Sequence, residues 1–454
     1  MGAYADVSCI RLCSGRRGFA GRAPTTGPFP TARMVQAAAP GDHDVTPPPS
    51  FARGAAPPSI VHLTTSLDIG GAQTMLAKLI ETGARRRRHP RHTVISLMRP
   101  GPLAARLQAC QCPVYDLGMR RSWPSPMTAL RLLRTTSALE PDLLQGWMYH
   151  GNLAASLVGL AGIAPVVWNV RHSLEDVSVE SAGTRRILAL STRLAHRTAA
   201  IIYNSRSAAA HHEKLGFPAA RTRIIPNGFD CARFDPNRAA RVDPRALFGI
   251  PEGPILVCMA ARLHPMKDHA MLVQAVGRAR QAGHDLHLLL VGPGLEAPSA
   301  LLRRQIAATL PPERVTLVPE RTDLSDWLAG VDIVALSSAW GEAFPNIVGE
   351  AMACGIPCVA TDVGDCRWIV GEGGFVTPAR DASAMADALG TLARIGAEGR
   401  RHIGLAGRAR ILETFSLEEI GRQYRRLYEQ LLAGPATVSA QPAIFAPNVR
   451  TGSA

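Results

Sequence analysis

The amino-acid sequence predicts an α/β protein made of two doubly wound domains in tandem, facing each other across a cleft. Short β-branched runs alternate with helical patterns along most of the chain, an order typical of parallel strands joined by crossover helices. The alternation stops at a polar, Pro-rich stretch, residues 229–252, and then starts again. Because 454 residues are too many for one ordinary core, two domains are expected.

The first domain is expected at residues 58–228, and its opening strand is predicted at Ile60–Thr65. A Gly70-Gly71 turn follows, and then a helix with the i, i+3, i+4, i+7 spacing of one buried face: Ala72, Met75, Leu76, Leu79 and Ile80. Further strands, each followed by helical sequence, are predicted at 92–98, 143–148, 166–171 and 199–204. Ligands of such sheets bind beyond the carboxyl ends of the strands, so chemistry is expected in the loops that follow them.

The second domain is expected at residues 253–433, with residues 229–252 as the linker. Its strands are predicted at 255–261, 286–291, 315–318, 333–337 and 358–361. The last helix, at about 416–433, could pack back on the N-terminal domain. Residues 1–57 and 434–454 lack hydrophobic periodicity, so they are predicted to be a disordered leader and tail.

The composition favours a cytoplasmic globular protein. Hydrophobic residues make up 46% and charged residues 19%, enough apolar material for two cores. No run of about 18 uncharged apolar residues occurs, so no segment is expected to span a bilayer, and no apolar signal-peptide core is found near the N-terminus. The nine cysteines form no framework, and Cys258, Cys354 and Cys358 are expected to be reduced core thiols.

The net charge of +14 is mostly arginine and includes the run Arg85–Arg88. Such a run is often a solvated helix end, but it would also suit an anionic lipid surface, and a peripheral position on the inner face of the plasma membrane is expected. Nucleic acid is not expected as a partner. Aromatic residues are only 5%, and no zinc-finger, RNP or basic-zipper pattern accompanies the charge.

The loop after the first strand of the second domain carries Arg262 and Lys267. Two cations five residues apart on one strand-to-helix loop can converge on a single ligand. The helix that begins near Asp268 adds its N-terminal amides, so the loop suits a diphosphate. Spacing alone leaves open that both are ordinary surface cations.

A second loop carries Glu342, with Glu350 in the helix that follows. Pro345 suits the first turn of that helix, and exposed backbone amides around Phe344, Asn346 and Ile347 could bind phosphate or sugar oxygens. A carboxylate accepts two hydrogen bonds and matches neighbouring hydroxyls of a ribose or hexose, whereas it would repel a diphosphate. Without further context, two surface glutamates are an equally open interpretation.

Two features of the first domain face the same cleft. The Gly70-Gly71 turn could approach a phosphate, but it lacks the G-x-G-x-x-G fingerprint and also fits an ordinary tight turn. His172 follows the strand predicted at 166–171, and a lone histidine there can be structural or catalytic.

Together these loops resemble the family 4 retaining glycosyltransferases of the GT-B fold, over roughly residues 58–432. Residues 337–362 read SSAWGEAFPNIVGEAMACGIPCVATD and resemble the family's Glu-x7-Glu motif, with Glu342 and Glu350 as its glutamates. Residues 261–269 read ARLHPMKDH and resemble the Gly-Arg-Leu-x3-Lys-Gly-His loop. Ala261 and Asp268 depart from the usual glycines, while the arginine and lysine are kept.

The resemblance implies roles for these residues. Arg262 and Lys267 would bind the donor diphosphate, Glu350 the ribose and Glu342 the transferred sugar, which the 344–347 backbone would align. The remaining implied donor contacts are made by His172, which would contact the sugar, and by three glycines: Gly70, Gly71 and Gly292.

The resemblance also implies a retaining hexosyltransferase that needs no metal and no cofactor. The Asp-x-Asp signature of metal-using glycosyltransferases occurs only as Asp42-His43-Asp44, with no strand before it. The expected donor is a nucleotide sugar, and among these a UDP-sugar is expected first. The expected acceptor is a glycan or a lipid-linked molecule in surface polysaccharide synthesis. An epimerase of similar fold and a degenerate, non-catalytic scaffold remain alternatives.

Overall fold

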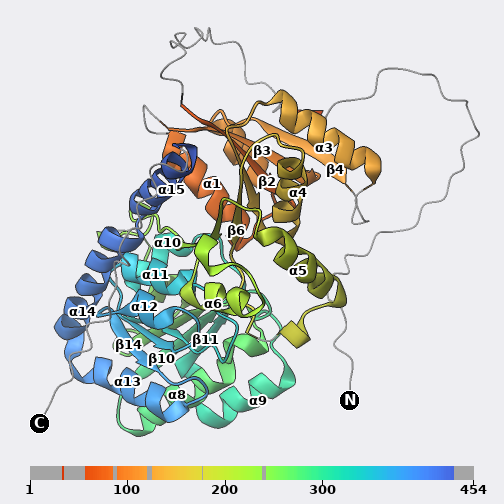
Figure 1. Ribbon diagram of the computed structural model, residues 1–454. Coiled ribbons are helices and arrows are strands. Elements are labelled where there is room, and N and C mark those ends of the chain that lie inside the picture. The colour runs from red at the N-terminus through yellow and green to blue at the C-terminus, as the bar shows by residue number, and fades with distance from the viewer. Residues whose placement is uncertain are drawn as a thin grey trace, which may run out of the picture. The chain divides into compact units, whose positions relative to one another are not determined.

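The computed structural model describes residues 33–34, 57–84, 89–119, 125–175, 177–237 and 242–433. It contains two largely parallel sheets, each flanked by helices (Figure 1). The predicted fold class, two Rossmann-like domains, is therefore confirmed. Each predicted strand is present, with bounds that differ by one residue at most.

The first sheet has the order β1-β4-β3-β2-β5-β6-β7-β8. Its parallel strands are β2 (Ser59–Thr64), β3 (Arg91–Met98), β4 (Val114–Met119), β5 (Leu143–Trp147), β6 (Val166–Val170), β7 (Ala200–Tyr203) and β8 (Thr222–Ile224). The two-residue strand β1 (Arg33–Met34) pairs with β4 in the antiparallel direction. The order reverses between β2 and β5, which places a ligand crevice at their carboxyl ends.

The second sheet repeats this order as β11-β10-β9-β12-β13-β14, and all its strands are parallel. The strands are β9 (Ile255–Ala260), β10 (Leu286–Val291), β11 (Val315–Val318), β12 (Ile333–Leu336), β13 (Cys358–Thr361) and β14 (Gly374–Thr377). Here the order reverses between β9 and β12, so the second crevice lies beyond these two strands.

Helices cover both faces of each sheet. In the first domain they are α1 (Gly71–Ala84), α2 (Leu103–Ala109), α3 (Pro126–Ala138), α4 (Met148–Leu160), α5 (Ala182–Ala195) and α6 (Arg206–Lys214). The later helices are α7 (Pro244–Phe248), α8 (His269–Gln281), α9 (Ala300–Thr309), α10 (Leu324–Trp327), α11 (Asn346–Ala353), α12 (Cys366–Val370), α13 (Ala382–Arg394), α14 (Gly396–Arg410) and α15 (Leu417–Leu432).

Successive side chains of strand β2 point to opposite faces of the sheet and pack in two separate cores. Ile60 faces the core shared with α1, whereas Val61 and Leu63 face the core shared with α4 and α5. All three side chains are fully buried. A strand buried on both faces reads as a continuous apolar run, which is why β2 was visible in the sequence.

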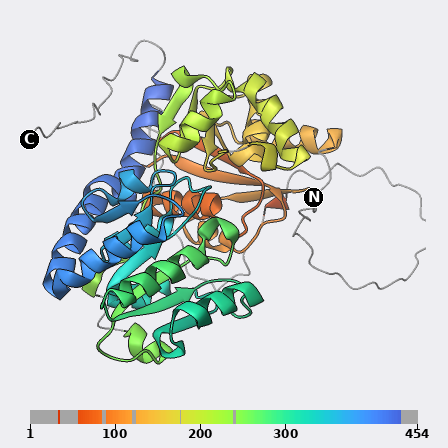
Figure 2. The ribbon, with the colours of Figure 1, turned by 90° about the horizontal axis from the view of Figure 1, so that it is seen from below.

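The last helix belongs to the first domain's core. Leu417, Ile420, Tyr424, Leu427 and Tyr428 of α15 are buried against α1 and the first sheet. Helices α15 and α1 lie side by side (Figures 1 and 2). The polypeptide therefore crosses from the first domain to the second and returns.

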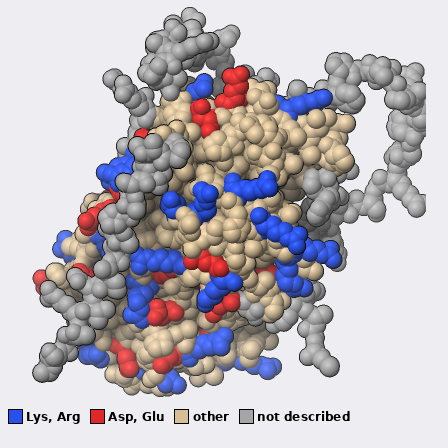
Figure 3. Space-filling view, viewed as in Figure 1, with Lys and Arg blue, Asp and Glu red and all other residues tan. Residues whose placement is uncertain are grey.

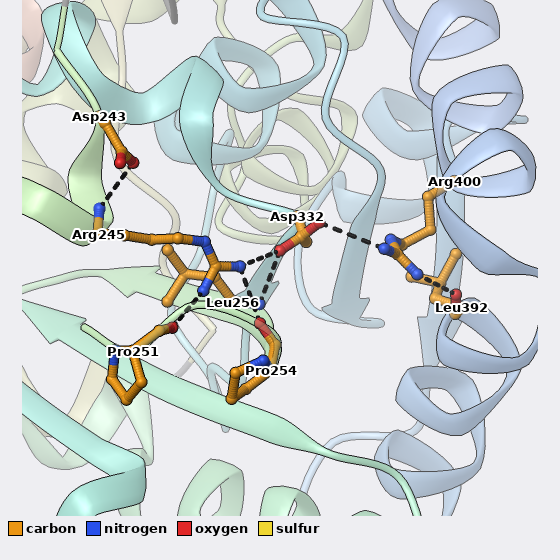
Figure 4. A network of polar contacts seen from close by, with 8 residues as sticks. All are labelled: Asp243, Arg245, Pro251, Pro254, Leu256, Asp332, Leu392 and Arg400. Carbon is orange, nitrogen blue, oxygen red and sulfur yellow. Dashed lines mark hydrogen bonds and ion pairs between the residues drawn. The ribbon is translucent and has the colours of Figure 1, made fainter.

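The stretch expected as a linker is ordered where the structure describes it, and it packs on the second domain. Phe229, Phe234 and Ile250 are buried in that domain's core. Within this stretch, Arg245 of α7 donates a hydrogen bond to the Asp332 carboxylate. The same carboxylate accepts from Arg400 of α14 and from the backbone N–H of Leu256 (Figure 4). One carboxylate thus ties three segments together at the amino ends of β9 and β12.

Several predictions fall outside the described residues. These are the Arg85–Arg88 run, the Asp42-His43-Asp44 triplet, the tail 434–454 and the leader, apart from Arg33–Met34 and Pro57. Arg33–Met34 differ from the expected disorder by forming β1. No helix within the described ranges has the length and apolar character needed to cross a bilayer.

Candidate active site

A cleft of about 580 Å³ lies at the carboxyl ends of strands from both sheets. Ten of the twelve predicted site residues line it: Gly71, His172, Arg262, Lys267, Glu342, Phe344, Pro345, Asn346, Ile347 and Glu350. Loops that are far apart in sequence therefore meet in one cavity.

Gly70 and Gly292 are not part of the lining. The Gly70 carbonyl accepts a hydrogen bond from the Thr74 N–H as α1 begins. Gly292 has a φ of +150°, and a Cβ there would lie 2.2 Å from the Ala261 carbonyl oxygen. Its lack of a side chain lets the loop after β10 approach the loop that carries Arg262.

The Arg262–Lys267 loop is shaped by local caps. The His264 side chain accepts from the Met266 N–H, and a short 3-10 helix, Pro265–Lys267, follows. Asp268 then adopts a φ of +45° and caps α8 through the Met271 N–H. Aspartate is among the few residues that tolerate this left-handed conformation, so it replaces the glycine usual here without losing the turn.

The two cations of this loop differ in their partners. Lys267 Nζ forms an ion pair with Glu342 Oε1, and the same oxygen accepts from Ser338 Oγ at 2.6 Å. Glu342 is only 8% exposed. Arg262 is exposed and forms no ion pair within the described part of the chain, so it remains available to an anionic ligand.

Glu350 projects from α11 into the cleft. Burial raises the pKa of its carboxyl group, and Lys78 of α1 and Arg233 act in the opposite direction. Lys78 belongs to the first domain, so cations from both domains lie near this carboxylate.

The first domain contributes polar residues that follow consecutive strands: Arg171 and Ser173 after β6, Asn204 after β7 and Asn227 after β8. Arg171 donates to Asn227 Oδ1 and to the Tyr424 hydroxyl of α15. Asn227 in turn donates to Asn346 Oδ1 at 2.7 Å. Sequence analysis missed these four residues, although Arg171 and Asn204 end predicted strands, Ser173 lies two residues after one, and Asn227 lies in a Pro-Asn-Gly turn.

His172 lies beside Tyr149 and Glu180. Its Nδ1 is 3.4 Å from the Tyr149 hydroxyl and its Nε2 is 3.7 Å from Glu180 Oε1. Burial lowers the pKa of the His172 imidazole, and the Glu180 carboxylate raises it in partial compensation.

Two carboxylates join the halves next to the cleft. Asp365 accepts from the Arg206 and Ser207 N–H groups at the start of α6, at 2.6 and 3.1 Å. Glu175 accepts from the Gly341 N–H at 3.2 Å. The Glu175 bond ties the loop that carries Glu342 to the first domain, and the Asp365 bonds tie the start of α12 to α6.

Family models account for both halves of this arrangement. The model described as Glycosyltransferase Family 4 matches residues 69–233, and the model described as Glycosyl transferases group 1 matches residues 253–394. The chain belongs to the family 4 glycosyltransferases of GT-B type.

Curated members of this family align with part of the chain. The D-inositol 3-phosphate glycosyltransferase of Rhodococcus erythropolis is 30% identical over 282 residues, 57% of this chain and 60% of the relative. The lipopolysaccharide core biosynthesis mannosyltransferase LpsB of Rhizobium meliloti is 29% identical over 292 residues, 59% of this chain and 80% of the relative. The alignment thus spans less than two thirds of the inositol phosphate enzyme.

Solved GT-B structures share the fold over most of the chain. HepE of Anabaena in complex with UDP and glucose has a TM-score of 0.68 at 22% identity, over 82% of this chain and 99% of HepE. Sucrose-phosphate synthase of Thermosynechococcus elongatus has a TM-score of 0.62 at 21% identity, over 83% of this chain and 99% of the synthase.

Proposed function

We propose that this family member transfers a hexose or N-acetylhexosamine from a nucleotide diphosphate sugar to a glycan or lipid-linked acceptor, with retention of configuration. The observation that carries the proposal is the shared cleft, which Arg262, Lys267, Glu342 and Glu350 line together. Cations suit the diphosphate and carboxylates suit hydroxyl groups.

The chemistry follows from where charge develops. The bond from the anomeric carbon to the diphosphate oxygen breaks, and its electron pair stays on the diphosphate. Arg262, Lys267 and the N-terminal amides of α8 stabilise that charge. The acceptor oxygen bonds to the same face of the anomeric carbon, and its proton passes to the departing phosphate oxygen. NMR of the product's anomeric configuration tests retention.

We also propose that the reaction needs no metal ion. The guanidinium of Arg262 and the ammonium of Lys267, together with helix amides, can supply the electrostatic stabilisation that a metal ion would give. Loss of transfer in EDTA with recovery in Mn²⁺ would refute this.

A UDP-sugar is the proposed donor, and surface polysaccharide assembly is the proposed setting. The complex of HepE with UDP and glucose and the role named for LpsB support these choices. The similarity to the inositol phosphate enzymes supports a second candidate acceptor, a small phosphorylated molecule. The basic side chains that line the cleft suit its phosphate group.

A peripheral position on an anionic inner leaflet is proposed from the first domain's outer helices. Helices α3, α4 and α5 contain no aspartate or glutamate. They expose Met127, Leu130, Leu160 and Leu190, and basic side chains gather near α5 and α6 in Figure 3. Co-sedimentation with phosphatidylserine vesicles at low salt is expected; a protein that stays in the supernatant would contradict it.

The decisive experiment is donor binding by calorimetry in EDTA. UDP-, GDP- and ADP-glucose are titrated into the wild type and into Arg262→Ala, which removes a cation that has no internal ion pair in the described residues. One donor should bind, and the substitution should weaken it at least tenfold, or about 1.4 kcal/mol.

Lys214→Ala is the matched control, because Lys214 is an exposed cation at the end of α6 and does not line the cleft. It should bind the donor as the wild type does. If no nucleotide sugar binds the folded wild type, the proposal fails in favour of a non-catalytic scaffold. Release of an epimerised nucleotide sugar without acceptor would favour the epimerase.

A further inference from the structure

Three side chains behind the cleft form a hydrogen-bonded row that ends at His172. The Tyr149 hydroxyl lies 3.0 Å from His212 Nε2 and 3.4 Å from His172 Nδ1. His212 is fully buried and Tyr149 is 8% exposed. Of the three, only His172 lines the cleft.

A backbone carbonyl sets the direction of the protons in this row. His212 Nδ1 lies 2.8 Å from the Ala208 carbonyl oxygen, and a carbonyl only accepts hydrogen bonds. His212 therefore carries its proton on Nδ1. Burial lowers the pKa of this imidazole to about 4, so it is neutral at physiological pH and its Nε2 holds a lone pair.

The proton on His212 Nδ1 determines which atoms of Tyr149 and His172 donate hydrogen bonds. Since His212 Nε2 accepts, the Tyr149 hydroxyl donates to it and its oxygen is left to accept. His172 then donates from Nδ1 to the Tyr149 oxygen. The opposite tautomer would set the Nδ1 lone pair against the oxygen lone pairs of Tyr149.

We propose that Tyr149 and His212 are positioning residues that hold neutral His172 in its Nδ1–H tautomer, so that Nε2 offers the cleft a hydrogen-bond acceptor. An acceptor at this place recognises a hydroxyl of the transferred sugar and rejects a carboxylate or phosphate, which has no proton to donate. Glu180 Oε1 lies 3.7 Å from Nε2, beyond hydrogen-bond distance. Its charge disfavours an anion there, and it also favours a proton on Nε2, which the row of hydrogen bonds from His212 opposes. This assignment rests on the proposed function and narrows its donors to sugars that present a neutral hydroxyl to His172.

A second buried tyrosine, Tyr203, packs against His212 and provides a control for Tyr149. Tyr203 is fully buried, its ring centroid lies 5.2 Å from that of His212, and its hydroxyl has no hydrogen-bond partner in the described structure. Tyr149→Phe and Tyr203→Phe thus each remove one buried hydroxyl group beside His212. Only Tyr149→Phe breaks the hydrogen bonds between His212 and His172.

The test is ¹⁵N NMR of the full-length protein labelled in histidine, with the His172 signals assigned by their loss in His172→Gln. The wild type should show a protonated Nδ1 and an unprotonated Nε2 at neutral pH. Tyr149→Phe should shift His172 toward the Nε2–H tautomer or a mixture, and Tyr203→Phe should leave it unchanged.

Calorimetry supplies the functional arm. Tyr149→Phe should bind UDP as the wild type does and bind UDP-glucose about tenfold more weakly, whereas Tyr203→Phe should match the wild type for both. A wild-type His172 protonated on Nε2, or a tautomer unchanged by Tyr149→Phe, overturns the assignment. If the wild type binds no nucleotide sugar, the proposed function fails separately, because the tautomer measurement needs no donor.

Discussion

Lys267 and Glu342 neutralise each other on the second domain's wall of the cleft. Ser338 holds the same carboxylate oxygen, so the pair is fixed from the side of β12 as well. A diphosphate that reaches Lys267 has to share it with Glu342, whereas Arg262 is available without such competition. The two cations therefore differ in what they offer a ligand, although the spacing of the sequence motif does not distinguish them.

Glu342→Gln should separate nucleotide binding from transfer. The substitution removes the charge that competes for Lys267, so UDP should bind as well as or better than to the wild type. It also removes a charged hydrogen-bond acceptor proposed to contact the sugar, so kcat should fall roughly 10- to 100-fold. Calorimetry with UDP and steady-state transfer assays measure the two effects.

Glu398→Gln is the control, because Glu398 is an exposed carboxylate on α14 away from the cleft. It should change neither quantity. A Glu342→Gln protein that loses UDP affinity in step with activity would show that Glu342 supports the nucleotide site as a whole.

At the scale of elements, every strand buried at all its positions was predicted, and the missed strands lie at or next to a sheet edge, although the edge strand β11 was also predicted. β2 and β10 are buried at every position. Of the missed strands, β8 and β14 are half-buried at most positions, and β4 is half-buried or exposed at four of its six. β8 and β14 end their sheets, and only the two-residue β1 lies beyond β4. Fewer neighbours cover such strands, so no continuous apolar run marks them.

The same distinction explains which site residues were found. Glu342 and Lys267 lie in loops directly after apolar strands, where local pattern is informative. The contacts of Arg171 with Asn227 and Tyr424 join residues 56 and 253 positions apart. No spacing rule exposes such pairs, because they depend on tertiary packing, and the contact with Tyr424 depends on the return of α15.

Asp332 is the residue on which the second domain's connections converge. Its partners Arg245 and Arg400 have side chains only 14% and 10% exposed. Asp332→Ala would leave both guanidinium groups largely buried without a counter-charge, and should lower the free energy of unfolding by about 2–3 kcal/mol. Chemical denaturation monitored by tryptophan fluorescence measures the change.

The matched substitution is Asp285→Ala in the same domain. Asp285 also pairs with two arginines, Arg280 and Arg314, but its side chain is 55% exposed. Solvent screens these pairs, so the loss should stay below about 1 kcal/mol. If the two variants lose the same free energy of unfolding, burial of the ion pairs around Asp332 adds nothing to their contribution to stability.

For the whole molecule, the first domain is assembled from two distant parts of the sequence. The chain leaves it near Phe229 and returns near Ser416, and these two residues form a bridge in which the Phe229 N–H donates to the Phe415 carbonyl and the Phe229 carbonyl accepts from the Leu417 N–H. From there α15 covers α1 and places Tyr424 against Arg171, at the edge of the cleft. The helix therefore links the fold of the first domain to the geometry of the site.

Residues 57–229 alone should fail to fold cooperatively. The five apolar side chains that α15 buries contribute roughly 1.5–3 kcal/mol each, a sum comparable to the whole stability of a domain of this size, about 5–15 kcal/mol. Because Phe229 and Ser416 are bridged, a short Gly-Ser linker from residue 229 to residues 416–433 should restore a cooperative thermal transition. The same fusion carrying Ile420→Asp should not melt cooperatively, since Ile420 is fully buried in this core. A fragment 57–229 that melts as sharply as the fusion would mean that the first domain is complete without α15, and that the helix serves only to hold the two domains together.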